Sequence, residues 1–153
     1  MRSSYQPLSR MSGFSLMEVL IAMLILSIGL LGLAALQATS LKTNQEAYQR
    51  TQATFLAYDM IDRIRANRAR ALAGNYDLAM ADDAPAGAAI DDVDVANWLN
   101  VYVAALMPAG DGSIDCTTTA GSCTITVQWD ASRTGGAATD SADIMQFAFT
   151  SEI

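Results

Sequence analysis

Few residues of this chain are of a type that could do chemistry: two cysteines, an acid at the start of an apolar segment, clustered arginines and clustered aspartates. The sequence contains no histidine, the commonest general base and metal ligand in proteins. No stretch resembles a nucleophile placed beside a base. We therefore expect that the protein is not an enzyme.

The two cysteines, Cys116 and Cys123, lie in the segment CTTTAGSC. Their spacing does not fit a CxxC metal knuckle, and no further Cys or His could complete a zinc site. A disulfide that closes a short hairpin is the simplest use, and it requires an oxidising compartment. The alternative is a pair of free buried thiols in a cytosolic protein. The long apolar segment described below independently suggests export and favours the disulfide.

An Asp-rich stretch could suggest calcium, because hard cations bind clustered oxygen ligands. Its acids are Asp82, Asp83, Asp91, Asp92 and Asp94. No Asp-x-Asp-x-Asp-Gly loop ending in Glu is present, however. Solvated loops and helix capping explain these acids better, with Asp94 capping a short helix over 95–107. We expect neither a metal nor a cofactor.

Four arginines at positions 63, 65, 68 and 70 could suggest nucleic-acid binding. Cations near the end of a helix also complement its dipole, and Asp59 and Asp62 are spaced to pair with Arg63 and Arg65. Beyond residue 70, twelve acids stand against Arg133 alone, which would repel phosphates. We expect no nucleic-acid partner, and DNA binding through the arginines stays as an alternative.

The elements that must position these residues begin with an apolar segment. No charged residue occurs from Val19 to Leu41, and as a helix this run would be about 34 Å long, enough for a hydrocarbon core of about 30 Å. A cleaved secretory signal would have a shorter apolar region followed by a small-residue cleavage site. An ordinary single-span anchor is the other simple interpretation.

Glu18 argues for something more specific. An acid within lipid costs on the order of 3 kcal/mol unless it is paired or lies near the interface. No Lys or Arg of the run can pair with it. Glu18 either starts the helix, where the dipole favours a negative charge, or meets a positive charge on another molecule.

The run GFSLMEVLIAMLILSIGLLGLAALQ, which follows a short leader with Arg2 and Arg10, resembles the N-terminus of type IV pilins, and most of all the PilV type of minor pilin. The resemblance implies that a prepilin peptidase cuts between Gly13 and Phe14 and methylates the new amine of Phe14. It also implies that the Glu18 carboxylate meets the methylated N-terminus of a neighbouring subunit.

Two features depart from the family pattern. Ser12 stands where many members have Lys or Arg, and no Pro interrupts the apolar helix, where Gly29 and Gly32 supply flexible points. The positive charges on the two sides of the apolar segment do not settle its orientation in the membrane. The prediction of a cytoplasmic N-terminus therefore rests on the motif and the cysteines.

The resemblance also implies a role and a location. The protein would be processed at the cell inner membrane, span it once, and pass through the periplasm to the pilus tip. Its partners would be other minor pilins, the major pilin, a possible tip adhesin and the prepilin peptidase. Together the minor pilins would start the filament. A minor pseudopilin of a type II secretion system is the alternative within the class.

We expect three parts: a leader (1–13), a transmembrane and filament-core helix (14–41), and a periplasmic pilin-like module (42–153). No Gly or Pro occurs between Leu33 and Leu72, so one helix could run from about Phe14 to about Ala73. The module would cover one apolar side of this helix. The buried stripe on that side would consist of Leu41, Tyr48, Phe55, Leu56, Met60 and Ile64.

The module should contain a short helix and a small sheet. The expected helix would bury Val95, Trp98, Leu99, Tyr102 and Leu106. Strands are indicated at 113–118, 122–130 and 144–150, with the first two joined by a turn at Ala120-Gly121 and the last preceded by the Gly135-Gly136 loop. The predicted fold class is α+β, pilin-like, with a long N-terminal helix packed on a small antiparallel sheet.

Overall fold

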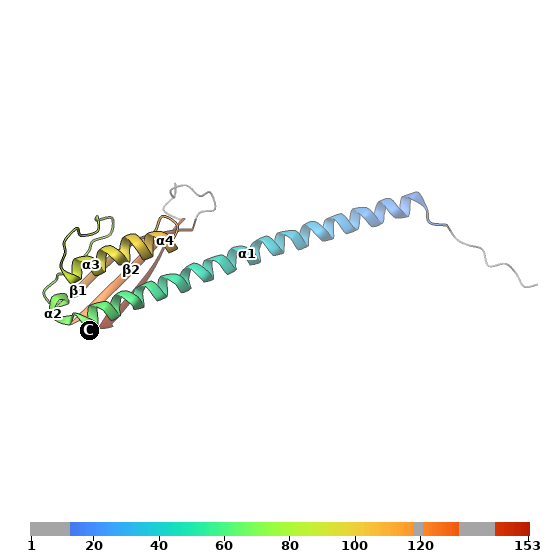
Figure 1. Cartoon of the computed structure of the whole chain (residues 1–153). Coiled ribbons are helices and arrows are strands. Elements are labelled where there is room, and N and C mark those ends of the chain that lie inside the picture. Colours follow the sequence, from blue (N-terminus) through green and yellow to red (C-terminus); the bar gives the residue numbers. More distant parts are fainter. Residues whose placement is uncertain (1–12, 118–120, 132–142) are drawn as a thin grey trace, which may run out of the picture. The chain divides into compact units, whose positions relative to one another are not determined.

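The structure is a computed structural model that describes residues 13–117, 121–131 and 143–153. The predicted leader up to Ser12, Ala120 of the predicted hairpin turn and the Gly135-Gly136 loop lie outside these residues. The first element is helix α1 (Leu16–Ala66), which Figure 1 shows as one continuous helix. The Met17 N–H donates to Ser15 Oγ (3.3 Å), so Ser15 caps the start of the helix.

Helix α1 ends at Ala66, and its predicted continuation to about Ala73 is wrong. Asn67 leaves the helical conformation (φ −125°, ψ 44°), and its side-chain amide donates to the Tyr76 hydroxyl (3.2 Å). Asn side chains favour such local hydrogen bonds over a helix interior. A short helix, α2 (Arg68–Ala71), follows the break.

The chain forms two compact units, one up to Thr43 and one from Asn44 to Ile153. In the first unit, the described residues form a single helical segment whose side chains are all exposed. The most apolar stretch of α1 has a mean hydropathy of 2.8. Among the described residues, α1 is the one helix long and apolar enough to cross a membrane.

The second unit contains three helical segments that follow one another without a break: α3 (Ile90–Asn97), the π-helical η1 (Trp98–Val103) and α4 (Ala104–Leu106). The helix begins at Ile90, so the prediction that Asp94 caps a helix over 95–107 is wrong. Asp91 and Asp92 lie in the first turn, where carboxylates complement the helix dipole.

The π-helical segment changes which side chains of this helix are buried. Val95, Trp98 and Leu99 are buried as predicted. Tyr102 and Leu106 were predicted to be buried but are 40% and 49% exposed, and Val103 and Met107 are buried in their place. A π-helical turn holds an extra residue, so the buried face moves on by one position.

Strands β1 (Asp111–Thr117), β2 (Ser122–Asp130) and β3 (Ile144–Glu152) form one antiparallel sheet in the order β1-β2-β3. The predicted three-stranded sheet is confirmed. Its register is continuous and places Cys116 opposite Cys123, and Ile125 opposite Phe149. Side chains alternate between the two faces of the sheet, and one face is buried along β1 and β2 and half-buried along β3.

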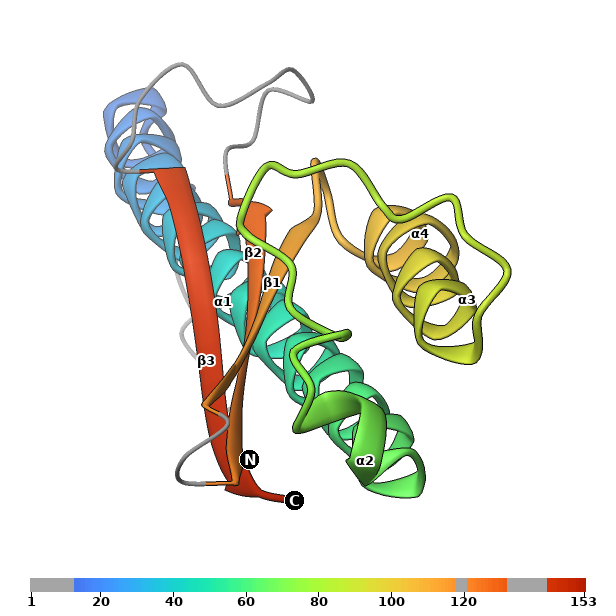
Figure 2. The same ribbon diagram turned by 90° about the vertical axis from the view of Figure 1, so that its left-hand side faces the viewer.

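The core of the second unit lies between this sheet face, the C-terminal half of α1 and the helix formed by α3, η1 and α4 (Figure 2). From α1, the predicted Leu56, Met60 and Ile64 are buried. The first three members of the predicted stripe, Leu41, Tyr48 and Phe55, are exposed. The buried side of α1 in fact follows positions 49, 53, 56, 57, 60, 61 and 64, so the stripe prediction is wrong before Leu56. The predicted α+β fold class is confirmed.

Candidate functional site

The start of α1 carries the residues that the sequence singled out. Gly13, Phe14 and Ser15 are exposed and non-helical, directly before the first helical turn. The predicted cleavage bond between Gly13 and Phe14 therefore lies in open backbone that an enzyme can reach.

Glu18 lies in the first turn of α1. Its surroundings are apolar and consist of Phe14, Val19, Ala22, Met23 and Leu26. Within the described part of the chain, no cation lies within ion-pair distance of its carboxylate. The arrangement is a single negative charge on an apolar surface, and it can bind a positive group supplied from outside this part of the chain.

The large apolar side chains from Phe14 to Leu41 are exposed on all sides of α1. Isolated exposed apolar residues are normal, but a contiguous apolar surface of this size marks a membrane or protein contact. A helix that is apolar all round needs lipid or other helices around it. We therefore expect lipid or other helices to surround this segment.

The arginines of the 63–70 cluster point to other parts of the second unit. Arg65 pairs with Asp62 (3.2 Å), as predicted, and also donates to Ser151 Oγ (2.7 Å) and to the Glu152 carbonyl (3.2 Å). Arg68 donates to the carbonyl of Ile153 (2.6 Å). These two side chains hold the C-terminal end of β3 against α1.

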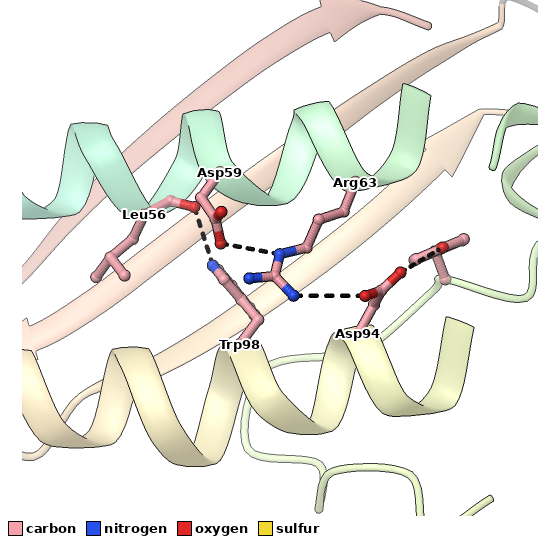
Figure 3. Close-up of polar contacts among 6 residues, drawn as sticks. Leu56, Asp59, Arg63, Asp94 and Trp98 are labelled. Atoms are coloured by element: carbon pink, nitrogen blue, oxygen red, sulfur yellow. Dashed lines mark hydrogen bonds and ion pairs between the residues drawn. The ribbon is translucent and has the colours of Figure 1, made fainter. Parts of the chain in front are cut away.

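Arg63 joins α1 to α3, as Figure 3 shows. Its guanidinium pairs with Asp59 (3.0 Å), as predicted, and with Asp94 (3.4 Å). Asp94 also accepts a hydrogen bond from the Tyr76 hydroxyl (3.0 Å). Burial, assisted by the Asp94 carboxylate, raises the pKa of Tyr76.

Arg70 pairs with Asp91, the most buried acid in the ion pairs of the described residues. Its Nε and Nη2 atoms donate to the two carboxylate oxygens of Asp91 (2.9 and 2.8 Å), whose side chain is only 3% exposed. The hydrogen bonds from Arg70 hold the pKa of Asp91 below its usual range. All four arginines of the cluster are therefore engaged in structural contacts.

The Asp-rich stretch does not come together as a ligand set in the part of the chain that the structure describes. No group of three or more His, Cys, Asp or Glu side chains there could hold a metal ion. Asp91 and Asp94 are instead used by Arg70, Arg63 and Tyr76.

Comparison with known protein families matches two adjoining stretches of the chain. Residues 8–34 match the prokaryotic N-terminal methylation motif. Residues 35–92 match the family described as Type IV pilin Tt1218. The two matches run on without a gap and together cover more than half of the chain. Over these residues the chain is similar to type IV pilins. Searches of curated proteins and of solved structures found no significant match.

The match to the methylation motif fits the geometry of the N-terminal segment. The methylation motif spans Gly13, Phe14 and Glu18 and reaches into the apolar helix. A pilin with this motif is processed by a prepilin peptidase and assembles with other pilins. The motif and the long apolar helix together indicate membrane anchoring.

The two cysteines form a disulfide in the structure, between Cys116 of β1 and Cys123 of β2. Both residues are buried, and they face each other across the two strands. The bridge closes the hairpin at the end nearest Arg68, whose guanidinium lies near Gly121.

Sequence reasoning missed the contacts that tie α1 to the rest of the pilin module. The Trp98 indole N–H donates to the Leu56 carbonyl (2.9 Å; Figure 3), and the Trp129 indole donates to Gln49 Oε1 (3.2 Å). The signal for such pairs is the need of a buried indole for an acceptor. Local sequence does not say which acceptor is used, because the partners are far apart along the chain.

Proposed function

We propose that this chain is a minor pilin of the PilV type, which joins other minor pilins at the inner membrane, starts a type IV pilus and stays at its tip. The observation that carries the proposal is the Glu18 carboxylate, which has no cation within ion-pair distance among the described residues. It lies in the first turn of an exposed apolar helix that bears the methylation motif. Such a charge is costly in lipid unless it lies near the interface or a second molecule supplies a cation.

In this proposal the peptidase cuts after Gly13 on the cytoplasmic side and methylates the new N-terminus at Phe14. The ammonium of a neighbouring subunit then pairs with Glu18, and a charge pair in lipid is strong enough to set the axial register. Residues 14–41 form the transmembrane and filament-core helix, and residues 42–153 form the periplasmic module. The chain has no catalytic part in this scheme.

A minor pseudopilin of a type II secretion system would use the same Gly13, Phe14 and Glu18. The motif and the fold fit either machine, so this remains the alternative. The DNA-uptake interpretation is weaker, because Arg63, Arg65, Arg68 and Arg70 already bind protein carboxylates and carbonyls.

The test is the substitution Glu18→Gln, which keeps the size of the side chain and removes its charge. The neighbour's ammonium would then be unpaired in lipid, at a cost of about 3 kcal/mol. We expect the variant to be cleaved after Gly13, to carry a methylated Phe14 by intact-mass analysis, and to stay in the membrane. It should no longer copurify with partner pilins, and surface filaments should become fewer.

Two control variants sharpen this test. Glu18→Asp retains the charge and should retain most of the copurification. Glu46→Gln makes the same chemical change outside the apolar segment and should leave copurification unchanged. Normal assembly of the Glu18→Gln variant would mean that Glu18 only starts the helix. A mature chain that keeps Met1 would contradict the prepilin interpretation altogether.

A further inference from the structure

The two edges of the pilin sheet differ in how their backbone groups are used. On β1, Ile114 exchanges both backbone hydrogen bonds with Leu78 (2.9 Å each). The Cys116 N–H donates to the Asp77 carboxylate (2.9 Å), and the Gly112 N–H donates to the Asp111 carboxylate (2.7 Å). The outward N–H groups of the β1 edge are therefore satisfied within the molecule.

The register shows which groups of β3 point outward. Because Ile114 bonds to Leu78, its backbone faces away from β2, so Ile125 opposite it bonds to β3. Phe149 lies opposite Ile125 and therefore bonds inward. By alternation, the backbone N–H and C=O groups of Gln146, Ala148 and Thr150 face the free edge.

No described residue satisfies these outward groups of Gln146, Ala148 and Thr150. Only at the end of the strand is a group used, where the Glu152 carbonyl accepts from Arg65. Exposed edges are normally protected by Lys, Pro, a bulge or a covering segment. Residues 144–151 contain no charged residue and no Pro, and their pairing with β2 has no bulge.

We infer that the β3 edge is a docking site for an extended strand of another membrane-anchored pilin subunit, which adds to the sheet as a fourth strand. This partner rests on the proposed function, since it is a subunit that assembles beside this one. Main-chain hydrogen bonds to Gln146, Ala148 and Thr150 would hold the strand. Apolar side chains at alternate positions of the strand would cover Phe147 and Phe149, which the core leaves half-exposed.

The geometry argues against a second copy of this chain as the occupant. The outward N–H groups of its β1 edge are already satisfied, so joining β1 to β3 in a row of copies would break these bonds. Two copies could also pair symmetrically through their β3 edges. If both α1 helices lie on the same face of the joined sheet, the two β3 strands are antiparallel. Tyr58 contacts Phe149 and Arg65 contacts Ser151, so α1 runs in the same direction as β3. The chains would then enter the pair at opposite ends, which does not suit two subunits anchored in one membrane.

The test is the full-length variant Ala148→Pro, produced in cells that make the partner pilins. Proline removes the outward N–H, and a free edge tolerates it because that N–H makes no bond to β2. We expect copurification of the partner pilin to fall about tenfold, as the loss of a hydrogen bond and close approach implies. Ala148→Ser, which keeps the N–H, should copurify like the wild type.

A second measurement does not depend on the proline. A benzophenone amino acid at Gln146 should crosslink, in intact cells, to a subunit that peptide analysis identifies as a pilin with a prepilin motif. The same group at Asp115, on the closed β1 edge, should give no such product. A product linking two copies of this chain, or only unrelated proteins, would overturn the inference.

The outcomes separate this inference from the proposed function. If wild-type protein copurifies with pilins and Ala148→Pro does so equally while keeping its near-ultraviolet circular dichroism, the edge is not the contact and only this inference fails. If wild-type protein copurifies with no pilin and Gln146 gives no pilin crosslink, both fail together.

Discussion

Replacing Trp98 by Phe should destabilise the pilin module by about 2 kcal/mol. Trp98 is fully buried, and its indole N–H donates to the Leu56 carbonyl (2.9 Å). Losing this hydrogen bond costs about 1 kcal/mol. The smaller Phe ring also leaves unfilled space between α1, η1 and β1, which costs about 1 kcal/mol more.

The assay is urea unfolding of the full-length chain in detergent micelles, followed by near-ultraviolet circular dichroism, which reports on packed aromatic side chains. A loss of about 2 kcal/mol should lower the urea midpoint by about 1 M. The control is Tyr102→Phe, which removes a polar atom from a ring on the same helix that is 40% exposed. We expect this control to stay within about 0.5 kcal/mol of the wild type.

The result that would refute the reasoning is a Trp98→Phe variant as stable as Tyr102→Phe. The indole contact would then contribute nothing to holding α1 against η1. A lower slope with an unchanged midpoint would point to a change in the unfolded state instead.

Two further predictions concern the same module. Gly112→Ala should destabilise it by about 1–3 kcal/mol, because an added Cβ would collide with the ring of Trp98. In the Trp98→Phe background the same change should cost less. Strictly additive shifts of the urea midpoint would contradict the contact. Hydrogen bonds from Arg70 lower the pKa of Asp91 in the folded state. The ionised Asp91 therefore stabilises the fold at pH values above the ordinary carboxyl pKa of about 4. This contribution is lost as the pH falls through the lowered pKa of the folded state. Asp91→Asn should therefore be less stable than the wild type at pH 7, and the gap should narrow towards about pH 2; equal gaps at both pH values would refute the assignment.

The features that the sequence by itself determined are those carried by neighbouring residues. The charge-free run from Val19 to Leu41, the motif around Gly13 and Glu18, and the alternation in Thr124–Trp129 each specify a local structure. The pairings of Asp59 with Arg63 and of Asp62 with Arg65 were also predictable, because they lie one helical turn apart.

The tertiary structure decided which faces of these elements are used. The π-helical turn in η1 exchanges Tyr102 and Leu106 for Val103 and Met107 in the core, and periodicity cannot anticipate it because an ideal helix has 3.6 residues per turn. Leu41, Tyr48 and Phe55 keep a regular spacing yet stay exposed, since the sheet packs on another side of α1.

The difference between the two sheet edges was also invisible in the sequence. Asp77 and Leu78 close the β1 edge from a loop more than thirty residues away (the Asp77–Cys116 separation is 39). On the β3 edge, the outward backbone groups of Gln146, Ala148 and Thr150 have no partner among the described residues. Both strands show ordinary strand composition. Whether a backbone group is satisfied depends on which distant segment folds beside it, and only the tertiary structure fixes that.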